Sequence, residues 1–305
     1  ARKAQIIKPQ KEVQKTKYAS PDEIDGAYRV LLSLLPLKEK HKSNLLSRGM
    51  SAKGIEDGLY RSIPENKEEM YTLMQKLNDM NIKLDGVPGF YKKGNSYRIS
   101  LPGLYDKNTK TFFYGSGFFV PSFGRNGKIF SMQIRMDDTY LSRFPAKQAK
   151  RRRYIWFTSS GYDSGCQAIN RATYGVVDGT PRNAGNVVYV TEGALKAQVA
   201  HDIDHKHRQF CAISGIANSE AFRKFVRTQK KAGCKILVDA FDMDRNEKDT
   251  VKNAIDKLYI IAEEEGLPLQ PFTWDERFKG IDDYLLHCRD ERIQQQIIME
   301  ICKTA

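Results

Sequence analysis

The sequence is short of the features that mark several large classes of protein. Its 305 residues include only five cysteines and no C-x-x-C spacing, so neither a zinc ribbon nor a disulfide framework is expected, and the thiols should be free and mostly buried. No apolar run approaches the roughly 20 residues that cross a bilayer, and the start shows no signal-peptide pattern. We therefore expect a cytoplasmic protein with no part in a membrane.

Acidic residues are outnumbered by basic ones. The 37 Asp and Glu face 50 Lys and Arg, which gives a formal net charge of +13, and such an excess is typical of proteins that bind a polyanion. A solvated helix face would explain the basic group at 223–235, but the run at 147–153 contains no acidic residue, and its self-repulsion indicates a bound anion. The basic residues of this run are Lys147, Lys150, Arg151, Arg152 and Arg153.

The pattern of residues changes twice within the first part of the chain. Residues 1–20 lack periodicity and are expected to form a flexible basic arm. Residues 21–83 carry apolar side chains at helical spacing, which predicts a small helical subdomain. Residues 84–185 are broken by glycines into short segments, and within them we predict strands at 118–123 and 128–135 joined as a hairpin by an Asn-Gly turn.

From residue 186 strand-like and helix-like segments alternate. The expected strands are 187–190, 210–214, 236–241 and 269–274, and the expected helices are 193–203, 218–231 and 246–265. This alternation predicts an α/β domain over 186–288, with a parallel sheet flanked by helices. A separate amphipathic C-terminal helix is expected within residues 289–305.

Acidic side chains follow two of the predicted strands. Glu192 comes after the first strand, and Asp242 and Asp244 come after the third. If these strands are neighbours, three carboxylates converge at the edge where ligands bind in open parallel sheets, and Mg²⁺ or Mn²⁺ would relieve their repulsion. A salt-bridged lysine filling the gap, with no room for an ion, would exclude this site. Asp239, inside the strand, either joins the site or is hydrogen-bonded within the sheet.

Each acidic group alone is a weak signal, but together they resemble a known family. An acidic pair after a strand is often only a turn with a helix cap. The sequence Val-Tyr-Val-Thr-Glu-Gly at 188–193, followed by a helix and then Asp-x-Asp after a strand, resembles the TOPRIM domain of bacterial-type DNA primases, type IA and II topoisomerases and certain nucleases. The resulting fold is α/β, a TOPRIM-type sheet preceded by a mixed strand and helix subdomain and the helical opening.

The resemblance extends beyond that domain. The hairpin at 117–135 and the segment 154–160 resemble parts of bacterial-type primases, and 279–285 resembles their late acidic motif. The helical opening, with His41 and Arg48-Gly49-Met50-Ser51, resembles primase-like proteins of phages and mobile elements.

The resemblance implies roles for individual residues. Glu192 would act as general base or indirect metal ligand, and Asp242 and Asp244 would hold one or two Mg²⁺ or Mn²⁺ ions. Asp282 and Asp283 would complete the ligand set. Guanidinium groups grip phosphate bidentately, so basic residues are expected to contact the template or the nucleotide triphosphate; these are Arg135, Lys150, Arg151, Arg152, Arg153 and Lys196.

The sequence departs from the primase pattern in three places. Bacterial-type primases carry an Asp four residues after the Glu, where this chain has Lys196. A lysine there would remove one metal ligand or take the place of one ion. The usual N-terminal zinc module is missing from these residues, and they contain no helicase-binding domain of ordinary size, so template selection and helicase coupling are expected from elsewhere.

We therefore expect a primase-like nucleotidyltransferase that makes short primers on single-stranded DNA from nucleoside triphosphates, in the replication of a phage or mobile element. A helicase or another replication protein is a candidate partner. Two alternatives stay open: a TOPRIM nuclease with the same metal site, and a non-catalytic nucleic-acid-binding module of a replication complex. A topoisomerase is disfavoured because the chain has little room for a separate catalytic-tyrosine domain.

Overall fold

The computed structural model describes most of the chain. It covers residues 17–304 with gaps at 108–109, 176–185, 205, 207 and 244–248, and side chains are described as far as residue 296. Residues 1–16, most of the expected basic arm, lie outside the described residues. No helix within the described ranges combines the length and the apolar character needed to cross a membrane.

The chain opens with four helices, as the apolar spacing predicts. They are α1 (Pro21–Ser33), α2 (Glu39–Ser47), α3 (Ala52–Asp57) and α4 (Lys67–Asp79). Ser20 and Glu23 form a reciprocal capping box at the start of α1, and the Ser51 hydroxyl accepts the Gly54 N–H at the start of α3. These caps satisfy backbone donors that the first turn of a helix leaves unpaired.

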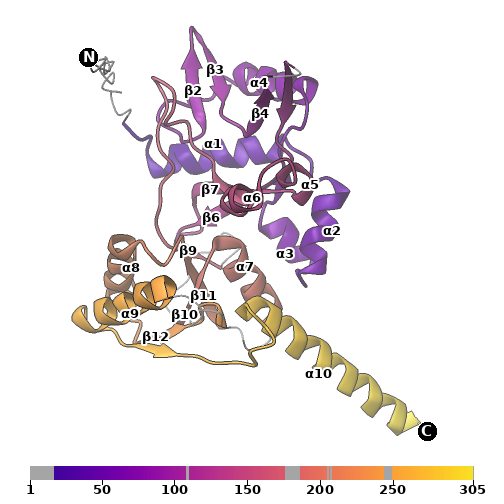
Figure 1. The fold of residues 1–305 in the computed structure, drawn as a ribbon, viewed down its shortest axis with the longest axis vertical. Helices are drawn as coiled ribbons and strands as arrows, with labels where there is room; N and C mark the ends of the chain where they lie inside the picture. The colour runs from indigo at the N-terminus through magenta and orange to yellow at the C-terminus, as the bar shows by residue number, and fades with distance from the viewer. Residues whose placement is uncertain are drawn as a thin grey trace, which may run out of the picture.

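A single nine-stranded sheet runs through the rest of the molecule (Figure 1). Its strands are β1 (Arg61–Ser62), β6 (Gly117–Phe123), β7 (Ile129–Met136), β8 (Tyr154–Trp156), β9 (Thr173–Tyr174), β10 (Val187–Glu192), β11 (Gln209–Ile213), β12 (Ile236–Asp239) and β13 (Leu269–Pro271). The order is β13-β12-β10-β11-β9-β6-β7-β8, with β1 on β6. The first four strands in this order are parallel, and the others pair antiparallel. The expected parallel sheet and the expected hairpin are thus halves of one mixed α/β sheet.

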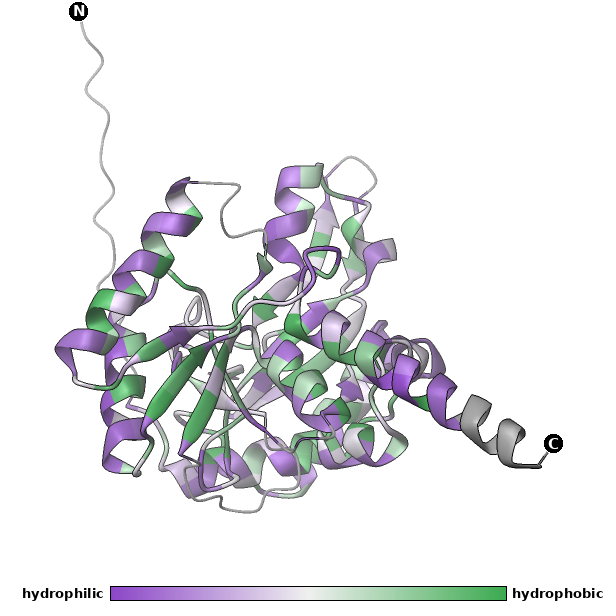
Figure 2. Ribbon diagram, turned by 90° about the horizontal axis from the view of Figure 1, so that it is seen from below, coloured by the Kyte–Doolittle hydropathy of each residue, from purple (hydrophilic) through white to green (hydrophobic). Residues whose placement is uncertain are grey.

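Helices cover both faces of the parallel half. They are α7 (Ala194–Ile203), α8 (Ser219–Lys231), α9 (Asp249–Glu264) and α10 (Ile281–Thr304). Alternate residues of β11 show the division: Phe210 and Ala212 pack with α7 and the start of α10, whereas Cys211 and Ile213 pack with α8 and α9. In Figure 2 the strands are largely hydrophobic and the helices carry hydrophilic bands, as expected for a sheet enclosed between helices.

Three expected boundaries were wrong. The C-terminal helix is not separate from the domain, because α10 begins at Ile281, runs through residue 289 without a break and projects from the body (Figure 1). Strand β12 ends at Asp239, whose carboxylate accepts the Phe241 N–H at 3.0 Å and turns the chain. Strand β13 ends at Pro271, although the next N–H, that of Phe272, still donates to the Asp239 carbonyl at 3.1 Å.

The glycine-rich stretch forms two small hairpins, neither of which the sequence analysis paired. They are β2 (Phe90–Lys93) with β3 (Ser96–Ile99), and β4 (Gly103–Asp106) with β5 (Thr111–Tyr114). Two short helices, α5 (Asp138–Leu141) and α6 (Ala146–Arg152), connect β7 to β8. The basic run at 147–153 therefore lies on α6 and directly after it.

The cysteines are free thiols, as expected for the four that are described. Cys166, Cys211 and Cys234 are buried, and Cys288 is partly buried. Burial raises the pKa of the Cys166 thiol to about 11, so this thiol stays protonated and inert at neutral pH.

A buried polar bridge fastens the helical opening to the sheet. The Tyr60 hydroxyl donates to the Gln198 side-chain oxygen at 2.6 Å, and the Gln198 amide donates to the Pro121 carbonyl at 2.7 Å. Tyr60 and Gln198 are both fully buried. The bridge thus joins the segment before β1 to α7 and β6, elements that are far apart in the chain.

Removing one hydroxyl from this bridge should measurably destabilise the protein. In Tyr60→Phe the ring still packs, but the buried Gln198 oxygen loses its donor, which costs about 1–3 kcal/mol. We expect the free energy of unfolding in urea to fall by that amount with an unchanged slope. Tyr18→Phe, at an exposed tyrosine, is the matched control, and equal stability of the two variants would contradict the assignment.

Candidate active site

Glu192 and Asp242 lie at the same edge of the sheet. Strands β10 and β12 are parallel neighbours, with Val190 paired to Asp239, and the Ala240 N–H extends the pairing by donating to the Val190 carbonyl at 2.9 Å. The two strands therefore end side by side, which is the arrangement on which the predicted acidic site depends. Asp244 lies outside the described residues, so its prediction stays untested.

A cavity of about 820 Å³ opens at this edge. Its acidic wall contains Glu192, Asp242 and Asp282, and Lys196 lies among them. Helix α6 and the residue that follows it also line the cavity, with Ala146, Ala149, Lys150 and Arg153, whose spacing places them on one helical face. The volume is in the usual range for a small-molecule site, roughly 300–1,000 Å³.

Asp282 enters the cavity wall from the start of α10. The Met243 N–H donates to the Lys279 carbonyl at 2.9 Å, which ties the loop after β12 to the turn before α10. Asp282 is 6% exposed, and its Oδ1 has no hydrogen-bond partner. Burial raises the pKa of Asp282, against the attraction of Lys196 and Arg48. A buried carboxylate oxygen without a donor is the type of ligand that a cation would satisfy.

Gly280 leaves open the space that Asp282 and Lys196 share. A Cβ at this position would lie 2.4 Å from Asp282 Oδ1 and 3.3 Å from Lys196 Nζ. A side chain at Gly280 would therefore collide with the carboxylate, and only glycine keeps this part of the wall clear.

Lys196 already neutralises one of the carboxylates. Its ammonium forms an ion pair with Asp242 Oδ1, and Lys279 Nζ lies 3.9 Å from Asp242 Oδ2. A metal site would be excluded by a salt-bridged lysine together with a lack of room for an ion. The lysine is present beside Asp242, but the cavity retains room. If a divalent ion binds here, the Asp282 carboxylate would hold it, beside the ammonium of Lys196.

Three further cations line the same cavity. They are Arg48, which the helical opening supplies, and Lys150 and Arg153. Arg48 is partly buried and donates to Asn44 Oδ1 at 3.3 Å, but among the described residues it forms no ion pair. A guanidinium that lines the cavity without an ion pair is available for an anionic ligand.

The turn after Arg48 is locked onto the parallel half of the sheet. Gly49 has φ of +89°, and a Cβ there would lie 2.6 Å from Leu286 Cδ1 of α10. The Gly49 carbonyl accepts from Arg289 Nη1 at 2.7 Å. The Ser51 N–H and hydroxyl both donate to the Asp202 carboxylate, at 2.6 and 3.0 Å. The Arg-Gly-Met-Ser sequence thus fixes Arg48 at the cavity, a site role that the sequence analysis missed.

Several expected site residues lie elsewhere. Arg135 is 5% exposed and donates to the Met136 carbonyl, so it does not line the cavity. Arg151 and Arg152 are exposed on α6 beside it, and Asp283 is exposed on α10. Asp239 is buried and accepts the Tyr259 hydroxyl at 2.8 Å, which favours the structural reading of this residue.

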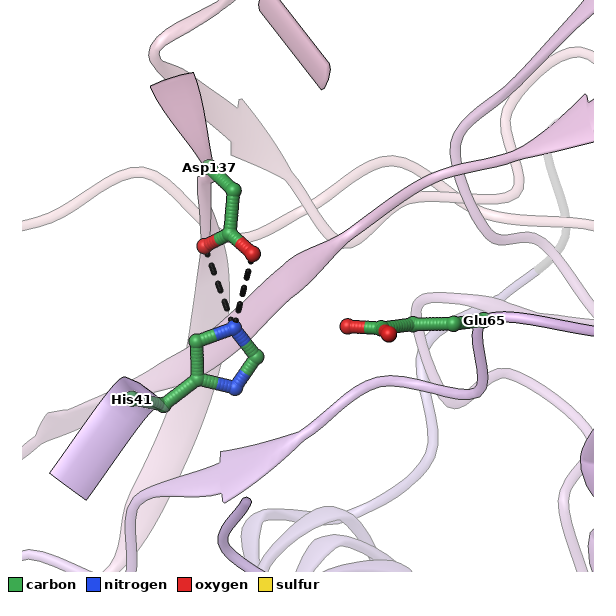
Figure 3. A group of neighbouring side chains, drawn as sticks. All are labelled: His41, Glu65 and Asp137. Atoms are coloured by element: carbon green, nitrogen blue, oxygen red, sulfur yellow. Dashed lines mark hydrogen bonds and ion pairs between the residues drawn. The ribbon is translucent and has the colours of Figure 1, made fainter. Parts of the chain in front are cut away.

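A second cluster of possible metal ligands lies away from this cavity. His41, Glu65 and Asp137 bring ligand atoms within 4.8 Å of one another. Figure 3 shows the His41 ring, on α2, bonded to Asp137, which follows β7, with the Glu65 carboxylate pointing toward the pair. The sequence analysis noted His41 only as part of the helical opening and did not anticipate the cluster, because its members are far apart in the chain.

The charge of this cluster is already balanced by the chain. Lys40 Nζ lies 2.7 Å from Glu65 and 3.0 Å from Asp137, and His41 Nδ1 is 2.6 Å from the Ser62 hydroxyl. Burial alone would raise the pKa of Asp137, but hydrogen bonds with His41 and Ser116 hold it well below its usual range. Both ring nitrogens and both carboxylates therefore have partners, and we interpret the cluster as a clamp that holds α2 against the end of β7.

Solved structures with a similar fold include bacterial primases. The RNA polymerase domain of Mycobacterium tuberculosis primase DnaG matches with a TM-score of 0.59 at 12% identity, over 90% of this chain and 82% of that one. The zinc-binding and RNA polymerase domains of Aquifex aeolicus primase match with a TM-score of 0.59 at 13% identity, over 92% of this chain. This chain spans 62% of the length of the Aquifex structure.

A DnaG primase catalytic domain bound to ssDNA also matches, with a TM-score of 0.57 at 11% identity, over 90% of this chain and 78% of that one. These likenesses establish the mixed α/β fold of a primase catalytic core. Residues 182–291 match the sequence model of a family described as "Domain of unknown function (DUF3854)". No curated protein sequence matches the chain.

Proposed function

We propose that this chain is a primase-like nucleotidyltransferase that builds short primers on single-stranded DNA from nucleoside triphosphates. The observation that carries the proposal is one cavity lined both by the carboxylates of Glu192, Asp242 and Asp282 and by the cations of Arg48, Lys150 and Arg153. A metal ion held by the carboxylates and phosphates held by the cations would place a nucleotide in this cavity. The primase fold supports this assignment.

The carboxylates and the cations that line the cavity would have separate chemical tasks. A divalent ion, when bound, lowers the pKa of a primer hydroxyl and neutralises charge on the nucleotide phosphates. Asp282 and Asp242 would hold it, and Glu192 would accept the proton of the attacking hydroxyl. Lys196 would supply a fixed positive charge where primases carry another carboxylate. Arg48 and Arg153 would orient the triphosphate, and exposed cations on α6 would hold the template.

The role of Arg48 gives a prediction for the kinetics. Arg48→Gln should raise the KM for nucleoside triphosphate about tenfold or more, because one charge-assisted hydrogen bond contributes about 1.5–3 kcal/mol. Thermal stability should change little. Steady-state synthesis at varied nucleotide concentration measures this effect, with Lys42→Gln, an exposed cation of the same helix, as the matched control. An unchanged KM would remove Arg48 from the site.

One observation favours a second candidate function. The ion pair between Lys196 and Asp242 occupies a carboxylate that a metal would need. If that pair persists during turnover, the chain is a non-catalytic nucleic-acid-binding module of a replication complex. We propose the enzyme as the better account because Asp282 keeps an unpartnered oxygen in the cavity wall.

Labelled synthesis on single-stranded DNA separates these functions. With Mg²⁺ or Mn²⁺ and either ribonucleotides or deoxyribonucleotides, the enzyme should yield short products that EDTA abolishes. Salt-sensitive binding without products identifies the non-catalytic module, and loss of the input DNA identifies a nuclease.

We further propose a helicase or another replication protein as partner and the replication of a phage or mobile element as the setting, which rests on the likeness of the helical opening alone.

A further inference from the structure

The β4–β5 hairpin presents aromatic rings to solvent on one of its faces. The register pairs Tyr105 with Phe112 and Gly103 with Tyr114, so these four positions lie on the same face. Tyr105 is 55% exposed and Phe112 is 47% exposed. The Phe112 ring meets Tyr114 edge-on, with centroids 4.8 Å apart. We call the rings of Tyr105, Phe112 and Tyr114 the aromatic face.

Phe112 and Tyr105 differ in what surrounds them. A Cβ at Gly103 would lie 2.2 Å from Phe112 Cζ, so the Phe112 ring covers this glycine and supports the hairpin. Tyr105, in contrast, makes no ring contact or hydrogen bond in the part of the chain that the structure describes. Its ring therefore has a free surface on which another flat group can stack.

The opposite face of the hairpin is anchored beside α6. The Arg143 guanidinium lies 4.3 Å from the centroid of the Phe113 ring, and Arg143 belongs to the connection between α5 and α6. Seven residues further along the chain, Lys150 lines the acidic cavity. The hairpin is thus joined through Arg143 and α6 to the candidate active site.

The hairpin turn and the neighbouring helix α6 both carry exposed cations. Lys147, Lys150, Arg151 and Arg152 are exposed on α6, and within the described ranges none of them forms an ion pair. Lys107 and Lys110, which flank the turn of the hairpin, are also exposed. Cations without counter-ions beside exposed flat rings suit a polyanion that carries unpaired bases.

We propose that the aromatic face stacks unpaired bases of a single-stranded nucleic acid whose phosphates lie along α6. Stacking on aromatic side chains tolerates any base, because every base has a π face, so this surface would hold the strand without reading its sequence. The inference rests on the proposed function only in taking the bound polymer to be single-stranded nucleic acid. It does not require that the chain synthesise a primer.

The test compares two oligonucleotides that differ only in having bases. Fluorescence anisotropy would measure the binding of a labelled 20-nucleotide oligo-dT and of an abasic oligonucleotide of equal length. Both titrations would contain EDTA and no nucleoside triphosphates. Tyr105→Thr should weaken oligo-dT binding about five- to tenfold, the lower part of the range for one stacked base, and leave abasic binding unchanged. Tyr105→Phe, which keeps the ring, should bind like the wild type.

Two controls separate stacking from charge and from folding. Tyr18→Thr removes an exposed tyrosine outside this surface and should change neither affinity. Lys147→Gln with Arg151→Gln should weaken both oligonucleotides and reduce the slope of log K against log salt concentration by about 0.7 for each phosphate that the variant no longer neutralises. In Tyr105→Trp the new indole should be quenched by oligo-dT and not by the abasic strand, which reports stacking even if Tyr105→Thr loosens the hairpin.

The outcomes decide the proposal independently of the enzyme assignment. Equal weakening of both oligonucleotides in Tyr105→Thr, no weakening of either, or an unquenched indole in Tyr105→Trp would overturn it. If oligo-dT binding depends on the Tyr105 ring but no primer is made under any metal condition, the aromatic face stands and the nucleotidyltransferase proposal fails.

Discussion

Replacing Asp242 and Asp244 together by alanine is expected to reduce primer synthesis by about 10³-fold or more. Asp242 lines the cavity after β12, Asp244 follows it by two positions in the sequence, and a bound cation contributes several kcal/mol to the stabilisation of the transition state. Asp242 is partly exposed, with its side chain 26% accessible, so its removal should cost little stability. Labelled synthesis and thermal unfolding of the same preparation measure both effects.

The control for this variant is Asp256→Ala on α9. Asp256 is exposed and outside the residues that line the cavity, so its replacement should leave synthesis unchanged. Wild-type rates in the Asp242 and Asp244 variant would reject the assigned metal site. Equal loss of activity and of folded protein would show only that the carboxylates are structural.

Replacing Asp282 by asparagine is expected to stabilise the metal-free protein while abolishing synthesis. Burial raises the pKa of Asp282 in the folded state, so its charged form is disfavoured there. The stability that the neutral Asp282 carboxyl contributes is fully present below its pKa in the unfolded chain. It is lost as the pH rises through the higher pKa that Asp282 has in the folded protein. At pH 7 in EDTA the neutral amide should gain about 1 kcal/mol, which is roughly 2 °C in Tm.

The pH dependence separates this effect from simple repacking. The gain of Asp282→Asn over the wild type should disappear near pH 3, where the wild-type carboxyl is protonated in both states. Calorimetry at the two pH values measures it. A variant that is less stable than the wild type at pH 7 in EDTA would contradict an unpaired buried charge at Asp282.

The sequence predicted the parts of the molecule that depend on local patterns. The alternating strands and helices and the Asn-Gly turn before β7 follow from spacing and turn chemistry alone. The pairing of β10 with β12 was the one long-range condition attached to the acidic pattern, and the structure confirms it.

What the sequence did not predict depends on contacts between distant segments. Arg48 reaches the cavity because Gly49 and Ser51 dock on α10 and α7, and the clamp at His41 joins residues that are up to 96 positions apart. Arg135 was expected at the nucleic acid, but its place on β7 buries it. The spacing of residues in the sequence does not distinguish an arginine that lines a cavity from one that is buried in a sheet.

The most direct test of the account is a titration of Mn²⁺ into the protein, followed by electron paramagnetic resonance, because the ion gives a signal without any turnover. The wild type should bind Mn²⁺, and Asp242→Asn and Asp282→Asn should each weaken binding about tenfold or more. Asp137→Asn, in the clamp that Lys40 neutralises, should bind as the wild type does. Equal affinity in the wild type and both cavity variants would contradict a cation held between β10, β12 and α10.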